Sequence, residues 1–210
     1  MTLKPLPTTL LASAATLAAL LAPGPGLAGG SPLEAPPFVP AAPETLVVDS
    51  GHSSVLFSIL HLGASRFYGR FNEVAGEIIF DEAEPANCQV EITVQASSLD
   101  TADKKRDQHA RGPDFLDAKQ FPTLSFKSEK ISREGGLWKA EGQFEMHGVT
   151  QPVSFEFEKV GEGKGSGGVK VVGFHARFEI DRRDFGMDYM TNMLGTTLEL
   201  IISLEAGARK

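Results

Sequence analysis

Cysteine is almost absent from this chain, which has a single one among 210 residues. One cysteine excludes an intramolecular disulfide, so the folded protein has to be stable without covalent cross-links. That residue, Cys88, falls on the apolar side of an alternating pattern, which indicates a buried and unreactive thiol. Basic residues are also in deficit, at 20 against 27 acidic ones, and the net charge is -7. This charge argues against nucleic acid or an anionic membrane surface as a partner.

Long hydrophobic runs are missing too. A membrane-spanning helix requires about 20 predominantly apolar residues, and the longest apolar run, residues 10–22, is shorter than that. It follows Lys4 and leads into small residues that end at Ala28. A charged start, an apolar middle and a small-residue exit are typical of a secretory signal peptide, whereas a membrane anchor requires a longer run. We therefore expect residues 1–28 to be a signal peptide cleaved near Ala28, and the mature protein to have no integral membrane segment.

Signatures of catalysis and of cofactor binding are not found in the sequence. The five histidines and the cysteine show none of the HExxH or CxxC spacings that mark metal sites. There is no phosphate-binding loop, no dinucleotide fingerprint and no GxSxG nucleophile elbow. These absences predict a protein without a metal, without a cofactor and without an enzymatic activity.

Proline marks the start of the folded domain. Nine of the 13 prolines precede Glu44, and residues 29–43 (GGSPLEAPPFVPAAP) have the composition of an extended linker. Residues 44–210 remain, a length that suits one domain.

The pattern that dominates residues 44–210 is a strict alternation of apolar and polar side chains, which is the period of a half-buried β-strand. It is clearest over residues 90–94, 153–157, 174–180 and 198–204. The adjacent glycines Gly135 and Gly136 predict a tight hairpin, and the glycine-rich tract 161–168 predicts a hairpin loop. Many antiparallel strands with one apolar face form either a sandwich or a barrel, and the long segment 67–80 favours a barrel.

Only residues 101–119 read as helical. Thr101 or Asp103 provides an N-cap, a charged body follows, and Gly112-Pro113 interrupts it before a second helical turn over 114–119.

Nine short motifs are distributed along the domain. They are 48–57 (VDSGHSSVLF), 61–63 (HLG), 69–71 (GRF), 98–101 (SLDT), 105–109 (KRDQH), 114–117 (DFLD), 121–126 (FPTLSF), 146–153 (MHGVTQPV) and 183–186 (RDFG). Together they resemble the YceI-like family, whose members are lipocalin-like barrels of the bacterial periplasm. The motifs follow the family's order and span nearly all of residues 46–206. A small departure is Ala110, which stands where the family often has leucine.

This resemblance implies an all-β fold, an eight-stranded antiparallel lipocalin-like barrel with one short helical insertion near 101–119. It also implies an internal tunnel that binds a long-chain apolar lipid such as a polyisoprenoid or an isoprenoid quinone, and a periplasmic location. The family has no established catalytic residues, and the resemblance is compatible with a homodimer. A barrel of eight strands is about wide enough either to be filled by side chains or to hold one slender ligand.

Phenylalanine is the most informative residue type, because 13 of the 14 lie beyond Glu44 and a ring without a polar atom needs no partner in an apolar interior. One interpretation is a filled core; the resemblance favours a lipid tunnel. If the interior is a tunnel, we expect the length of the tunnel and the side chains that block its end to select the ligand. The lining predicted from the strand pattern consists of Phe57, Ile59, Phe71, Phe80, Val90, Ile92, Phe126, Phe144, Phe155, Phe157, Phe174, Phe178, Leu200 and Ile202.

A second candidate site is the charged stretch 103–111. Four side chains of this stretch, together with a fifth at the barrel rim, are candidates to meet a polar or anionic head group at a tunnel mouth. The alternative is a solvated helix and an ordinary rim. The methionines at 187, 190 and 193 indicate either a flexible apolar flap or a packed loop. The head-group candidates are Lys105, Arg106, His109, Arg111 and Arg183.

The sequence therefore predicts a periplasmic protein that carries or stores one long apolar lipid. Two alternatives stay open. One is an enzyme that acts on such a lipid, which would require acid and base residues inside the tunnel. The other is a structural module of the stress response with a filled core and no ligand.

Overall fold

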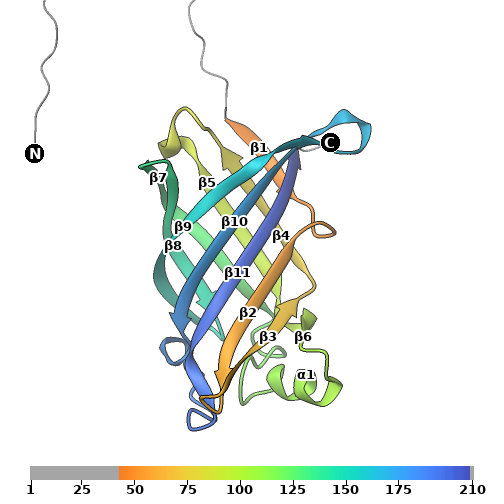
Figure 1. Ribbon diagram of the computed structural model, residues 1–210, viewed down its shortest axis with the longest axis vertical. Helices are drawn as coiled ribbons and strands as arrows, with labels where there is room; N and C mark the ends of the chain where they lie inside the picture. The colour runs from red at the N-terminus through yellow and green to blue at the C-terminus, as the bar shows by residue number, and fades with distance from the viewer. Residues whose placement is uncertain (1–42, 209–210) are drawn as a thin grey trace, which may run out of the picture. The chain divides into compact units, whose positions relative to one another are not determined.

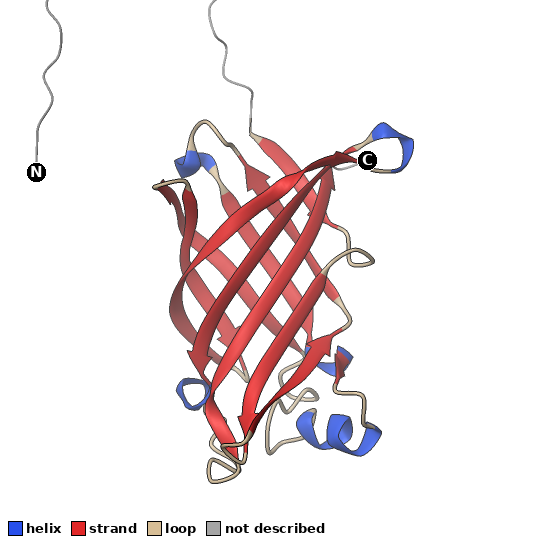
Figure 2. Ribbon diagram, in the orientation of Figure 1, coloured by secondary structure: helices blue, strands red, loops and turns tan. Residues whose placement is uncertain are grey.

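The computed structural model describes residues 43–208, and these form an all-β domain with one α-helix (Figures 1 and 2). The predicted signal peptide, and all of the predicted linker except its last residue, lie outside the described residues. Between residues 43 and 208 no helix combines the length and the apolar character needed to cross a bilayer.

The elements follow the alternation seen in the sequence. The strands are β1 (Glu44–Val48), β2 (Ser54–His61), β3 (Ser65–Phe71), β4 (Val74–Phe80), β5 (Gln89–Gln95), β6 (Leu99–Asp100), β7 (Thr123–Glu134), β8 (Leu137–Met146), β9 (Val149–Lys164), β10 (Lys170–Asp181) and β11 (Leu194–Ala208). The helices are α1 (Lys104–Ala110) and four short 3₁₀ turns, η1 (Pro85–Asn87), η2 (Ala96–Ser98), η3 (Ser166–Gly168) and η4 (Arg182–Phe185).

These eleven segments form the eight strands of a closed antiparallel barrel, which confirms the predicted fold. Three of the eight strands are interrupted, so that β1 continues into β2, β3 into β4 and β5 into β6. The pairings show this, because β2 pairs with β3 while β1 pairs with β4, and β4 pairs with β5 while β3 pairs with β6. β11 closes the ring by pairing with β10 on one side and with both β1 and β2 on the other.

The two ends of the barrel differ. In Figure 1, α1 and the β2–β3 and β10–β11 connections gather at the bottom, which we call the mouth end. The β7–β8 hairpin and the β9–β10 connection lie at the top, which we call the far end. The hairpin turns at Gly135 and Gly136, whose φ angles of 59° and 93° favour glycine. The tract 161–168 is less of a loop than predicted, because residues 161–164 pair with β10 and extend β9 to Lys164.

The helical region is also shorter than predicted. Asp103 caps α1 by accepting a hydrogen bond from the Arg106 amide at 2.9 Å, as the sequence indicated. The second expected helical turn, over 114–119, is a series of turns instead. Pro113 lacks an amide hydrogen, and Asp117 has a left-handed φ of 41°, so the chain cannot continue the helix there.

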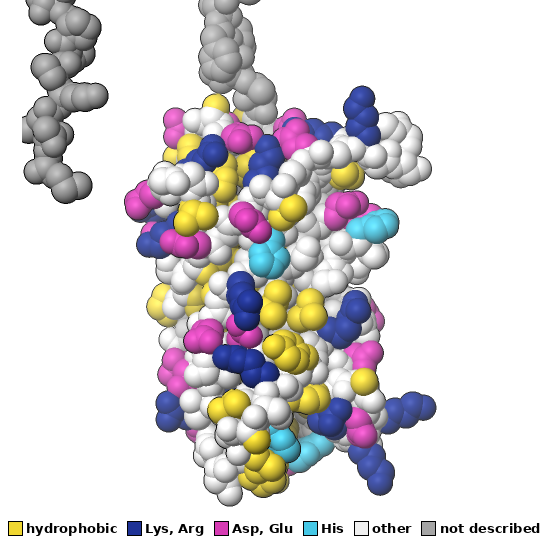
Figure 3. Space-filling view, in the orientation of Figure 1, with side chains coloured by type: hydrophobic (Ala, Val, Ile, Leu, Met, Phe, Trp, Pro, Cys, Tyr) yellow, Lys and Arg dark blue, Asp and Glu magenta, His cyan; other side chains and the backbone are white. Residues whose placement is uncertain are grey.

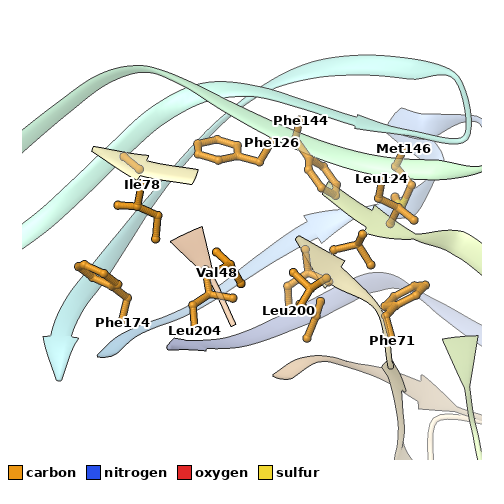
Figure 4. Packing of buried hydrophobic residues seen from close by; sticks show 14 of the residues in the cluster. Val48, Phe71, Ile78, Leu124, Phe126, Phe144, Met146, Phe174, Leu200 and Leu204 are labelled. Carbon is orange, nitrogen blue, oxygen red and sulfur yellow. The ribbon is translucent and has the colours of Figure 1, made fainter. Parts of the chain in front are cut away.

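Inward-facing side chains from all sides of the barrel make the core, part of which is shown in Figure 4. Cys88 belongs to it, as predicted, with 6% exposure. Its thiol donates to the Asp81 carbonyl at 3.3 Å and accepts from the Asp81 amide at 3.2 Å. Burial raises the pKa of this thiol, which keeps it protonated and poorly nucleophilic.

The outer wall carries a buried carboxylate on β11, the strand that closes the barrel. Glu199 of β11 has a side chain only 6% exposed and accepts from Ser58 of β2 at 2.7 Å and from Arg177 of β10 at 2.6 Å. Arg66 adds an ion pair at 3.4 Å. The Ser58 hydrogen bond, followed by that of Arg177, holds the pKa of the Glu199 carboxyl below its ordinary value of 4.5. Elsewhere on this face, charges of both signs are interspersed with apolar side chains (Figure 3).

Glu199→Gln is expected to lower the free energy of unfolding at neutral pH by about 1–3 kcal/mol, because charge-assisted hydrogen bonds at a buried site are lost. The direction in which the free energy of unfolding changes with pH follows from the lowered pKa of Glu199. The carboxylate stabilises the fold fully above its ordinary pKa, and this contribution disappears as the pH falls through the lower folded-state pKa. Urea unfolding at a series of pH values should therefore show a smaller loss of stability in acid for the variant. Glu91→Gln, at an exposed site, is the control; equal curves for both variants would contradict the prediction.

Candidate functional site

Two cavities lie inside the barrel. The one nearer the mouth end, the mouth chamber, has a volume of about 550 Å³. The one nearer the far end, the inner chamber, has a volume of about 110 Å³ and a lining that is almost wholly apolar. Small-molecule sites in proteins have volumes of about 300–1,000 Å³, so the mouth chamber alone reaches that range.

Three side chains line both chambers, and we call them the neck: Phe71, Leu124 and Leu200. All three are buried, and they come from β3, β7 and β11. Figure 4 labels all three among the buried side chains of the interior. Phe57 packs beside Phe71 with ring centroids 5.9 Å apart. The ring of Phe57 lies over Gly69, where an added Cβ would be 2.4 Å from it, so the close approach requires glycine.

An aromatic cluster, the plug, ends the inner chamber toward the far end. Phe80 lies 5.0 Å from the Trp138 ring and 5.2 Å from that of Phe174, and Phe157 stacks on Trp138 at 5.9 Å. Trp138 is 2% exposed. Outside this cluster, Arg133 lies over the Trp138 ring, so a cation–π contact covers the plug. The plug therefore lies between the inner chamber and the far end of the barrel.

The wall beside the inner chamber has a seam. Backbone pairing between β9 and β10 ends at Phe157 and Ala176. From Phe157 toward Val149, at the mouth end, β9 pairs with β8 alone. Phe155 and Phe178 stack across the seam with centroids 4.3 Å apart and planes at 7°. Side chains rather than backbone hydrogen bonds thus seal this part of the barrel.

The chain around α1 forms one side of the mouth. Asp107 is buried and accepts from both the amide and the hydroxyl of Thr101, at 2.7 and 2.5 Å. Arg106 donates to the Thr101 hydroxyl at 2.9 Å and stacks on Phe67 at 4.4 Å. These contacts fix α1 against the start of the helical insertion and hold Arg106 at the edge of the mouth chamber.

Three aromatic rings connect this side of the mouth with the β10–β11 connection. The centroids of His109, Phe115 and Tyr189 lie 5.1, 5.6 and 5.5 Å apart in three edge-to-face pairs. Asp114 hydrogen-bonds the His109 ring at 2.8 Å. We call these three rings the lid. Tyr189 is 44% exposed, so the lid lies at the surface, where opening it breaks few buried contacts.

All fourteen side chains predicted to line a tunnel line one or both chambers. Phe57 and Ile59 line the mouth chamber, Phe71 and Leu200 form part of the neck, and the other ten line the inner chamber. Of the head-group candidates, Lys105, Arg106 and His109 line the mouth chamber.

The other two head-group candidates are not among the residues that line either chamber. Arg111 donates to the Leu99 carbonyl, and Arg183 is held by the Asp181 carboxylate at 2.6 Å. The Arg183 guanidinium holds the pKa of the Asp181 carboxyl at about 2.

Sequence reasoning missed Arg182, which is 2% exposed and lines the mouth chamber. The sequence analysis predicts a role for its neighbour Arg183, because no periodicity distinguishes two adjacent arginines in a turn. Met187 and Met190 also line the mouth chamber, so two of the three methionines singled out as a flap or packed loop lie at this site. Ala110, the departure from the family pattern, lines it too.

One group of side chains has the geometry of a weak cation site. The ligand atoms of Asp49, His52 and Glu205 lie within 4.8 Å of one another at the β1–β2 junction. The hydrogen bond between Asp49 and His52 lowers the pKa of the carboxyl and raises that of the imidazole. None of the three lines a chamber, and Asp49 and His52 are exposed, so the group is separate from the tunnel.

Known proteins resemble this chain over the whole barrel. A family model for the YceI-like domain matches residues 46–206. A UPF0312 protein of Enterobacter sp. (strain 638) is 35% identical over 185 residues, which cover 88% of this chain and 96% of that protein. The crystal structure of a Campylobacter jejuni YceI protein superposes with a TM-score of 0.64 at 28% identity, covering 72% of this chain and 90% of that one. A domain from Saccharophagus degradans has a TM-score of 0.61 at 12% identity, covering 78% and 98%, and shares the fold.

Proposed function

The chain belongs to the YceI-like family, and from this premise we propose that it is an exported protein that holds one long apolar lipid tail inside its barrel. The observation that carries the proposal is the pair of chambers. A mouth chamber of about 550 Å³ shares three apolar lining residues with an inner chamber of about 110 Å³, and an aromatic plug lies beyond the inner chamber.

The volume of the mouth chamber supports binding rather than a structural role alone. Protein interiors are close-packed, and voids larger than a water molecule are few. A filled core, which is the ligand-free alternative, would not leave a cavity of 550 Å³. The enzyme alternative requires convergent acid and base groups at the reacting atoms. The inner chamber instead presents a lining dominated by phenylalanine, valine, isoleucine and leucine, which suits a hydrocarbon tail.

The proposed mechanism is passive. Each buried CH₂ contributes about 0.8 kcal/mol, so one isoprene unit contributes roughly 3–4 kcal/mol at most. Ordering of the tail offsets part of this gain, and the lipid leaves by mass action or with a partner's help. The Saccharophagus degradans domain is described as polyisoprenoid binding, which supports the same ligand class for this chain.

The mouth end is the proposed entrance. Lys105 and Arg106 are exposed cationic side chains at the edge of the mouth chamber, and His109 belongs to the lid beside them. They would meet the polar end of the lipid before the tail enters. The segment 1–28, with its signal-like pattern, and the family membership together support export to the periplasm.

Native mass spectrometry combined with lipid extraction tests the proposal. The protein, purified without detergent from a bacterium that exports it, is expected to carry one long-chain lipid per barrel. Ala110→Phe, which adds a ring to the wall of the mouth chamber, should carry much less, while the exposed Ala75→Phe should bind as the wild type does. A barrel that stays empty after incubation with prenols and fatty acids would contradict lipid binding, and chemical conversion of the added lipid would indicate an enzyme. The same spectra report whether the chain is a homodimer.

A further inference from the structure

Arg182 is a buried cation at the wall of the mouth chamber. It is the first residue of η4, directly after β10, and is 2% exposed. The adjacent Arg183 is 55% exposed at its side chain and is paired with Asp181. Two arginines that are neighbours in the sequence therefore have opposite environments.

The hydrogen bonds of Arg182 use only part of its guanidinium. Nε donates to the Gly195 carbonyl at 3.0 Å and Nη1 donates to the Met187 carbonyl at 2.5 Å. Nη2 is buried and has no hydrogen-bond partner. Among residues 43–208, no carboxylate lies within ion-pair distance of this guanidinium, although Asp181 and Asp188 act on it from farther away. Burial, which outweighs these two charges, lowers the pKa of Arg182.

An unpaired buried charge is costly, and a buried donor without an acceptor adds to that cost. The mouth chamber offers little to offset it: the lining residues nearest to Arg182 in the sequence, Met187, Met190 and Leu194, are apolar, and the one carboxylate of the lining, Asp103, already caps α1. A guanidinium presents its donors in a planar fork that matches a carboxylate or a phosphate. A carboxylate or phosphate that enters the chamber would supply the acceptor that Nη2 lacks.

We propose that Arg182 anchors the anionic head group, a carboxylate or a phosphate, of the lipid whose tail runs through the neck into the inner chamber. This inference rests on the proposed function and specifies the ligand's polar end. The head group would lie inside the mouth chamber behind the lid, and the exposed Lys105 and Arg106 would act on it only during entry.

A structural role for Arg182 makes a different prediction. The two carbonyl hydrogen bonds hold the turn after β10 against β11, so removal of the side chain could loosen the mouth for every ligand. An anchor, in contrast, affects only ligands that carry a negative charge. Matched pairs of probes with the same tail separate the two roles: palmitate with palmityl alcohol, and farnesyl phosphate with farnesol.

The experiment measures the affinities of both probe pairs for the full mature chain and for two variants. The wild type is expected to bind at least one anionic probe about tenfold to a hundredfold more tightly than its neutral partner. Arg182→Gln should remove this preference and leave the affinity for the neutral probes unchanged. Arg183→Gln, which makes the same change in charge outside the chamber, should keep the preference.

Several results would overturn the inference. One is a wild type without preference for either anion, and another is an Arg182→Gln variant whose neutral and anionic affinities fall together. If that variant does not fold, Arg182→Lys retains the charge and should keep part of the preference. A preference for one anion only would identify the head group as carboxylate or phosphate. Failure of the wild type to bind any of the four probes would instead refute the proposed function, so the two failures can be distinguished.

Discussion

Leu200→Phe is expected to lower the affinity for long-chain lipids by roughly 30- to 150-fold and to leave short-chain ligands nearly unaffected. Leu200 lies at the neck, and a ring at this position closes the passage between the chambers. A long tail would then leave the inner chamber of about 110 Å³ empty. At about 24 cal/mol per Å³ of cavity, the loss is about 2–3 kcal/mol. Titration with a series of prenols of increasing length measures the effect.

Ile201→Phe is the matched control, because Ile201 follows Leu200 in β11 and points to the other face of the sheet. It adds a similar ring to the same strand without entering the tunnel. The chain-length profile of this variant should equal that of the wild type. If Leu200→Phe leaves the profile unchanged, the tail does not pass the neck, and the inner chamber is only a packing defect.

Trp138→Ala is expected to destabilise the lipid-free protein by about 3–5 kcal/mol, the usual cost of removing a buried aromatic side chain. Trp138 is 2% exposed and packs against Phe80 and Phe157 in the plug. For a domain of this size the melting temperature should fall by about 6–20 °C. Thermal and urea unfolding of delipidated protein provide the measurement, since a bound lipid would stabilise the folded state.

The neighbouring Leu137 provides the control for this prediction. It is 50% exposed, and Leu137→Ala should change the stability by less than about 0.5 kcal/mol. A similar small change for Trp138→Ala would mean that the plug does not contribute to the core and that the far end is loosely packed.

The period of two explains why the residues that line the two chambers were predictable as inward-facing side chains. Side chains alternate between the two faces of a strand, so once Phe174 faces inward, Ala176 and Phe178 must do so as well. The segment 67–80 was predicted as one long strand, and its interruption between β3 and β4 was missed, because such a break depends on how a closed barrel bends and not on local composition. Cavity volume was beyond prediction for a related reason, since it depends on how closely rings from different strands approach.

The polar part of the site was less predictable. The periodicity of β10 ends at Asp181, so it could not show that Arg182 turns inward while Arg183 stays outside. The lid joins His109 and Phe115 to Tyr189, a residue distant in the sequence, and no local pattern reports such a contact. An adjacent pair of arginines after a barrel strand was the only available signal, and it identified the place but not the residue.

The single tryptophan of the chain allows a direct test of whether a lipid tail occupies the tunnel with its end toward the plug. Trp138 contacts Phe80 and Phe157, which line the inner chamber. Bromine on a lipid quenches tryptophan fluorescence at short range. Palmitate brominated at the end of its tail should quench Trp138 strongly, and palmitate brominated next to its carboxylate should quench it weakly. Equal quenching by both, or stronger quenching by the second, would show that the tail does not reach the inner chamber.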